Sequence, residues 1–170
     1  MKIVIASRAT IYLLTGLLIT FTQSHSANTG LLFLAVFGIG LAVVNSISSF
    51  FVKSGIWSLD SLPISIAAAV VGAVASFIPA ANPTAAGLAF VYLVAGWGLI
   101  AGSFDLYLAR RSGFKSRSGK DSLISSVLSL ILGVLFLAVP IDIVSAVGFF
   151  GAYLVLSGVH LAIAALTPEK

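Results

Sequence analysis

The sequence predicts an all-α integral membrane protein with six transmembrane helices, arranged as three tandem helical hairpins in one orientation. Its composition, its long apolar runs and an internal repeat all point to this class. Of its 170 residues, 59% are hydrophobic and only 8% are charged, whereas soluble domains carry about 25% charged residues. A soluble domain of this size would need far more polar surface to cover its core. We therefore expect lipid to surround most of the chain, which we treat as one membrane domain, residues 1–170.

Six apolar runs predict the spans, because about 20 helical residues cross a hydrocarbon core about 30 Å thick. They are Ala9–Gln23, Gly30–Val52, Leu62–Ile78, Thr84–Ala109, Leu123–Val139 and Val144–Leu166. The first, third and fifth runs are short, so we expect their helices to extend by about a turn or to lie in thinned lipid. The runs are continuous rather than alternating, which argues against a barrel.

The basic residues predict the orientation of the spans. All nine fall before the first span, after an even-numbered span or at its cytoplasmic end: Lys2, Arg8, Lys53, Arg110, Arg111, Lys115, Arg117, Lys120 and Lys170. The connections on the other side contain no Lys or Arg. Cytoplasmic loops carry the excess of basic residues, so both termini are predicted to be cytoplasmic. The loop from Arg110 to Lys120 is expected to contact anionic lipid headgroups.

The N-terminal segment allows one alternative. A basic start, the apolar run Ala9–Phe21 and the polar stretch up to Ala27 also fit a secretory signal peptide. Cleavage after Ala27 would leave five spans. The repeat favours the six-span interpretation, because Gly16 fits its pattern.

One segment of the chain occurs twice. Asp60–Pro79 and Asp121–Pro140 share their first three residues, their last residue and an internal glycine at an offset of 61 residues (121 − 60). The same offset relates Ser65 to Ser126, Gly72 to Gly133, Gly87 to Gly148 and Tyr92–Val94 to Tyr153–Val155. The repeated unit is therefore a hairpin of two spans, and we predict equivalent surroundings for Tyr92 and Tyr153.

The first two spans form a more diverged third copy, in which Gly16 takes the place of Gly72. The three hairpins cover approximately residues 9–52, 60–109 and 121–166. Since a two-helix unit returns the chain to the same side, the repeats are parallel. Many transporters instead use inverted repeats with broken helices.

The repeated residues predict helix ends. Asp60 and Asp121 are placed where a carboxylate caps the free N–H groups of a helix start. Pro79 and Pro140 are placed where a residue without an N–H ends a helix.

Four glycines predict close helix packing. Gly72 and Gly133 lie in the middle of their spans, and Gly98 and Gly102 form a GxxxG pair. Small residues allow membrane helices to approach closely, either within the chain or between the subunits of a homo-oligomer.

A few polar residues remain inside the spans, namely Asn45, Asp105 and His160 on the cytoplasmic side of the even-numbered spans. By depth they are candidates for one polar cluster. Polar groups in membrane helices mark functional sites, but they also act as interhelical hydrogen bonds or salt bridges. Asp105 has Arg8 and the nearby arginines as candidate partners, and His160 has a neighbouring helix. Ser157 lies three residues before His160, but the pair lacks the orienting acid and oxyanion site of a hydrolase.

A family resemblance follows from the repeat and three phrases: "YLVAGWGLIAGSFDLYLARR" (Tyr92–Arg111), "LILGVLFLAVP" (Leu130–Pro140) and "GAYLVLSGVHLAIAAL" (Gly151–Leu166). Together they resemble the HdeD acid-resistance membrane proteins, which belong to a wider group of bacterial membrane proteins defined by a short repeat of unknown function. The resemblance implies a six-span protein of the bacterial cytoplasmic membrane, linked in some members to survival of acid stress. It implies no catalytic residues.

Several chemistries are disfavoured. Without cysteine, thiol redox and thiolate metal sites are excluded. The two histidines and five acidic residues show no metal-ligand spacing, no P-loop or dinucleotide motif appears, and no nucleic-acid-binding pattern is present. We therefore expect a non-enzymatic membrane protein with no cofactor and no metal. The alternative is a small proton or solute channel or transporter that uses Asn45, Asp105 and His160.

Overall fold

The computed structural model describes residues 2–51, 62–78 and 81–167, which form six α-helices and no strand. The helices are α1 (Lys2–Phe21), α2 (Ala27–Phe51), α3 (Leu62–Phe77), α4 (Pro83–Ser112), α5 (Arg117–Ala138) and α6 (Ile143–Leu166). Five of them are long and apolar enough to cross a membrane, and α3 is apolar but has 16 residues. The predicted all-α class is confirmed, and the apolar helices are those of a multi-pass membrane protein.

Polar side chains fix where the later helices begin. Ser116 caps α5 by accepting a hydrogen bond from the Gly119 N–H at 2.9 Å. Because this cap allows the polar segment before Asp121 to be helical, Asp121 lies inside α5, and its predicted capping role is wrong. Pro140 follows the last residues of α5, as predicted. Asp60 and Pro79 lie outside the described residues.

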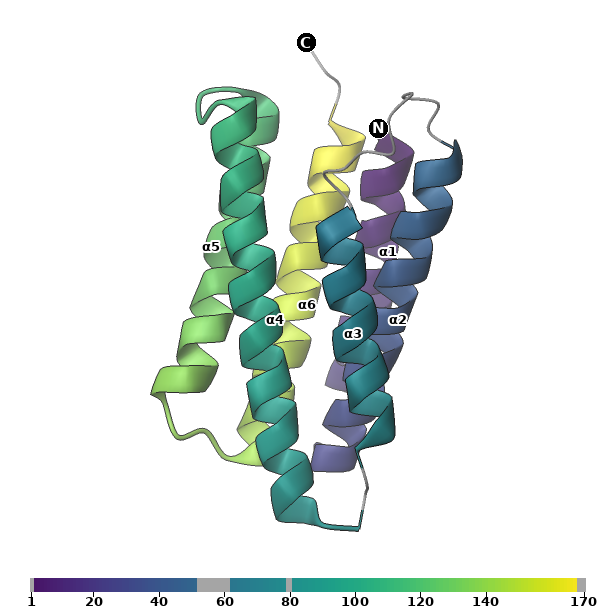
Figure 1. Ribbon diagram of the computed structural model, residues 1–170, viewed down its shortest axis with the longest axis vertical. Coiled ribbons are helices and arrows are strands. Elements are labelled where there is room, and N and C mark those ends of the chain that lie inside the picture. Colours follow the sequence, from purple (N-terminus) through teal and green to yellow (C-terminus); the bar gives the residue numbers. More distant parts are fainter. Residues whose placement is uncertain (1, 52–61, 79–80, 168–170) are drawn as a thin grey trace.

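The helices run alternately up and down, as Figure 1 shows. The start of α1, the end of α6 and the connection between α4 and α5 lie at one end of the bundle, which we call the basic end. The exposed Arg110, Arg111, Lys115, Arg117 and Lys120 are also at this end.

The helices pair differently from the sequence hairpins. Each odd-numbered helix packs most extensively on an even-numbered helix of another hairpin: α3 on α2, α5 on α4, and α1 on α6. Contacts between the two helices of one hairpin are smaller, and α2, α4 and α6 also contact one another. The first and last helices thus close a ring of three pairs around a centre made by the even-numbered helices.

Burial shows which positions in the central helices are equivalent. Leu34, Val94 and Leu154 are each fully buried and are spaced by 60 residues (94 − 34 and 154 − 94). The offset of 61 residues therefore does not extend into α6. Tyr153 is buried, whereas Tyr92 is 62% exposed, so the prediction that they have equivalent surroundings is wrong.

The difference of one residue arises in a connection. The chain passes from Phe77 to Pro83 between α3 and α4, but from Ala138 to Ile143 between α5 and α6. The second connection is one residue shorter, which changes the offset from 61 residues before it to 60 after it. The Tyr-Leu-Val segments of α4 and α6 therefore share their sequence but do not occupy equivalent positions in the fold.

Glycines allow the close approach within all three pairs. A Cβ added to Gly98 would lie 2.7 Å from two backbone atoms of α5, the Gly133 nitrogen and the Ser129 carbonyl oxygen. Gly38 of α2 and Gly72 of α3 meet in the same way.

The third pair differs, because α6 contributes Gly158, which packs on the backbone of Leu13 in α1. Leu13 therefore takes the place of Gly72 in the first copy. The assignment of that place to Gly16 is wrong, because Gly16 faces Gly151 and Val155 further along α6.

Aromatic side chains fill the centre of the bundle. Phe37 packs edge to face on Trp97 at 5.2 Å and on Phe150 at 5.9 Å, and Phe150 packs on Phe90 at 5.8 Å between ring centroids. All four are fully buried. The centre between the even-numbered helices is therefore solid over these layers.

Candidate functional site

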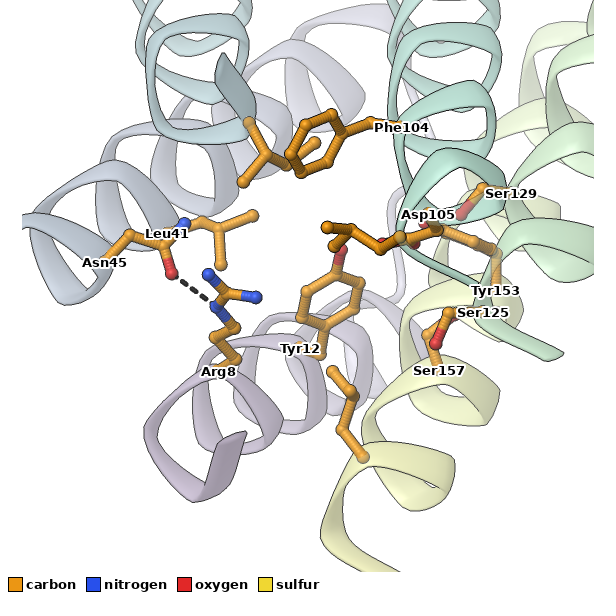
Figure 2. Close-up of a pocket in the computed structure, with 13 residues that line it drawn as sticks. Arg8, Tyr12, Leu41, Asn45, Phe104, Asp105, Ser125, Ser129, Tyr153 and Ser157 are labelled. Carbon is orange, nitrogen blue, oxygen red and sulfur yellow. Dashed lines mark hydrogen bonds between the residues drawn. The ribbon is translucent and has the colours of Figure 1, made fainter. Parts of the chain in front are cut away.

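A cavity of about 60 Å³ lies between the helices towards the basic end. Its walls combine charged, hydroxyl, amide and apolar groups: Arg8, Tyr12, Leu41, Asn45, Ile64, Phe104, Asp105, Leu108, Ser125, Ser129, Tyr153, Ser157 and Leu161. Figure 2 shows these side chains converging from helices on all sides of the cavity. A water needs about 10–15 Å³ when volume is measured in this way, so the cavity has room for about four waters.

Helical spacing explains how each helix contributes to the cavity. Residues four apart lie on one face of a helix. Arg8 and Tyr12 have this spacing on α1, Leu41 and Asn45 on α2, and Ser125 and Ser129 on α5, while α6 supplies Tyr153, Ser157 and Leu161. On α4, Asp105 is the equivalent of Asn45, since both belong to the series spaced by 60 residues. These equivalent positions place the Asn45 amide and the Asp105 carboxylate at the same depth in the bundle.

Arg8 and Asp105 are the two charged groups of the cavity. The Arg8 Nε–H donates a hydrogen bond to Asn45 Oδ1 at 2.5 Å. Within the described part of the chain, no direct hydrogen bond joins Arg8 to Asp105, although both side chains line the same cavity. Opposite charges held apart in a confined space create a strong local field. A small polar molecule that fills the gap would interact with both.

Hydroxyl groups from α5 and α6 line part of the cavity. The Ser129 and Tyr153 hydroxyls share a hydrogen bond at 3.0 Å. The Ser157 hydroxyl is buried and has no hydrogen-bond partner among the described residues. A buried hydroxyl without a partner costs free energy, so Ser157 has an unused donor and acceptor for a molecule in the cavity.

His160 does not line the cavity. Its Nε2 lies 3.0 Å from the backbone oxygen of Asp121 in α5, so the imidazole links α6 to α5. Of the three residues in the predicted cluster, the structure brings Asn45 and Asp105 together and places His160 elsewhere. Ser157 and His160 also have separate environments.

We expect His160→Ala to leave the fold intact. The substitution removes one interhelical hydrogen bond, and such bonds contribute about 0.6 kcal/mol on average in membrane proteins. Circular dichroism and a denaturation curve in detergent should show unchanged helix content and a small loss of stability. Global unfolding of the variant would contradict this structural role.

Three polar residues of the cavity were not singled out in the sequence: Tyr12, Ser125 and Ser129. Tyr12 could have been found from its spacing of four residues from Arg8, once Arg8 was placed inside the bundle. Ser129 has no comparable signal, because serines are frequent in α5. Among the described residues, no group of three His, Asp or Glu side chains could hold a metal ion.

The predicted packing glycines lie at helix pairs within the chain. Gly72 faces α2, Gly133 faces α4, and Gly98 and Gly102 face α5. These contacts use the GxxxG pair inside the subunit.

Comparison with known proteins gives one match. Residues 64–138 match a family described as a short repeat of unknown function (DUF308), and this segment covers most of α3, all of α4 and α5. No curated protein and no solved structure matches the chain. Over residues 64–138, the chain is thus similar to the short-repeat family that includes the HdeD-like membrane proteins.

Proposed function

We propose that this chain is a non-enzymatic protein of the bacterial cytoplasmic membrane that supports survival of acid or related stress without conducting protons or solutes. Both termini and the basic end face the cytoplasm in this proposal, since all the Lys and Arg residues belong to that side. The resemblance to HdeD proteins and the match of residues 64–138 to the short-repeat family support it.

The aromatic centre of the bundle is the observation that supports a protein that does not conduct protons or solutes. Phe37, Trp97, Phe90 and Phe150 are fully buried between the cavity and the other end. A proton pathway needs a continuous chain of polar groups or water. These layers offer aromatic rings instead, so the polar cavity ends inside the membrane.

The alternative is a proton or solute pathway that begins at Arg8, Asn45 and Asp105. The charged cavity favours this alternative, because ionisable groups inside membrane proteins often mark transport pathways. It requires the aromatic layers to open, which is a motion of the central helices against closely packed neighbours.

Proton flux in liposomes distinguishes the two functions. The full chain is reconstituted with an internal pH dye, a pH step is imposed, and the rate of decay is compared with protein-free liposomes. We expect equal rates, because the centre is closed. The matched variant Asp105→Asn keeps the shape of the side chain and should leave this background rate unchanged.

Fast decay that Asp105→Asn abolishes would contradict the proposal and favour the transport alternative. The stress role is tested separately by expressing the wild-type chain in a bacterial host and counting survivors after exposure to acid. Equal survival with and without the chain would contradict that part of the proposal.

A further inference from the structure

The polar cavity has an apolar neighbour on the outer surface of α4. A shallow depression, open along one side, is lined by Leu99, Ile100, Ser103, Phe104 and Tyr107. We call it the α4 groove. Phe104 also lines the polar cavity, so the cavity and the groove share this side chain. Ile100 and Tyr107 are more than half exposed, which places the groove on the surface that faces lipid.

The length of α4 indicates the depth of the cavity. The helix has 30 residues, about 45 Å at 1.5 Å per residue, whereas the hydrocarbon core is about 30 Å thick. If Pro83 lies at the far interface, about 20 residues bring the chain to Gly102 at the near one. Asp105 then lies at the level of the lipid headgroups, and the groove from Tyr107 to Leu99 runs from that level towards the bilayer centre.

The charges of the cavity select a headgroup. Arg8 offers a guanidinium, which pairs well with a phosphate, and Asp105 offers a carboxylate for an ammonium. The buried Ser157 hydroxyl, which has no hydrogen-bond partner among the described residues, provides a further hydrogen-bond acceptor. A headgroup with one phosphate and one primary ammonium would satisfy all three groups.

We propose that the cavity and the α4 groove together bind one phospholipid of the phosphatidylethanolamine class from the leaflet at the basic end. Its phosphate lies at Arg8, its ammonium lies at Asp105 and Ser157, and one acyl chain follows the groove past Phe104. This site is independent of whether the protein conducts protons, and it is tested by lipid binding alone.

The test is a competition between lipids for the full chain in detergent, read by native mass spectrometry. Phosphatidylethanolamine, phosphatidylcholine and phosphatidylglycerol are compared with identical acyl chains. We expect phosphatidylethanolamine to bind about tenfold or more tightly than phosphatidylcholine, because only a primary ammonium donates charge-assisted hydrogen bonds to Asp105. Equal binding of these two lipids, or tighter binding of phosphatidylglycerol, would overturn the proposal.

Variants locate the site. Asp105→Asn should abolish the preference for phosphatidylethanolamine over phosphatidylcholine, and Arg8→Gln should weaken both lipids. The control Arg110→Gln removes an exposed charge one to two turns further along α4 and should leave the preference unchanged. A preference that survives Asp105→Asn would overturn the assignment. If that variant does not fold, the comparison of the three lipids on the wild-type chain still decides.

A water-soluble headgroup separates a lipid site from a site for small molecules. Glycerophosphoethanolamine carries the same charges without acyl chains. We expect it to compete poorly, because it cannot fill the α4 groove. Competition at concentrations equal to those of the intact lipid would show that the cavity binds a soluble zwitterion and would overturn the lipid assignment.

Discussion

Gly98→Ala is expected to destabilise the bundle by about 1–3 kcal/mol, the usual cost of forcing an extra group into a packed core. The new Cβ would lie 2.7 Å from backbone atoms of α5, and backbone cannot rotate away as a side chain can. The α4–α5 pair would have to separate, with loss of the van der Waals contacts that hold membrane helices together. Unfolding in a mixed-micelle denaturant titration, followed by circular dichroism, measures the change.

Gly96→Ala is the matched control, because it makes the same chemical change on the same helix. An added Cβ at Gly96 meets nothing within 4 Å, and alanine favours helix more than glycine does. We expect unchanged or slightly higher stability. Equal effects of the two substitutions would show that the α4–α5 contact is looser than the structure indicates.

Trp97→Ala is expected to cost about 3 kcal/mol or more, the range for truncating a large buried aromatic side chain. The indole is fully buried and packs edge to face on Phe37. Its removal leaves a void at the centre of the three even-numbered helices, where the neighbouring rings have no freedom to collapse.

Trp97→Phe tests whether packing alone explains this cost. The indole N–H has no hydrogen bond of standard geometry among the described residues, so phenylalanine removes no such bond and retains an aromatic ring. We expect a loss well below that of Trp97→Ala in the same denaturation assay. Equal losses would indicate that the indole nitrogen makes an essential polar contact.

Much of the fold follows from the sequence for a physical reason. Lipid requires every backbone group to be satisfied within its own segment, so apolar runs predict helices almost directly. The helix ends were less predictable. The polar turn before Asp121 is helical because Ser116 caps it, and a cap depends on local geometry that composition does not reveal.

The pairing of the helices could not be derived from the repeat. A repeat identifies equivalent helices. It does not show whether an odd-numbered helix packs on the even-numbered helix of its own hairpin or on that of the preceding hairpin. Gly72 has the same sequence context in either arrangement. The contacts of α3 with α2, including the backbone contact of Gly72 with Gly38, show which arrangement the chain adopts.

The candidate site was predictable in part. Depth along the spans brought Asn45 and Asp105 together correctly, because depth depends on position in the sequence. The same reasoning from depth also placed His160 in the cluster, but His160 faces α5 instead. The direction in which a side chain points depends on the rotation of its helix, and the small-residue patterns of these spans did not define that rotation.

The closed ring has a consequence for biosynthesis. The main packing partner of α1 is α6, which leaves the ribosome after the other five helices. At about 5–20 residues per second, α1 waits in the membrane for roughly seven to thirty seconds before α6 is complete. During that time its glycine-containing face and Arg8 must be shielded by lipid, by insertion factors or by temporary contacts with α2. Ribosome-bound chains that stop before α6 should therefore be far more sensitive to membrane proteases than the released protein.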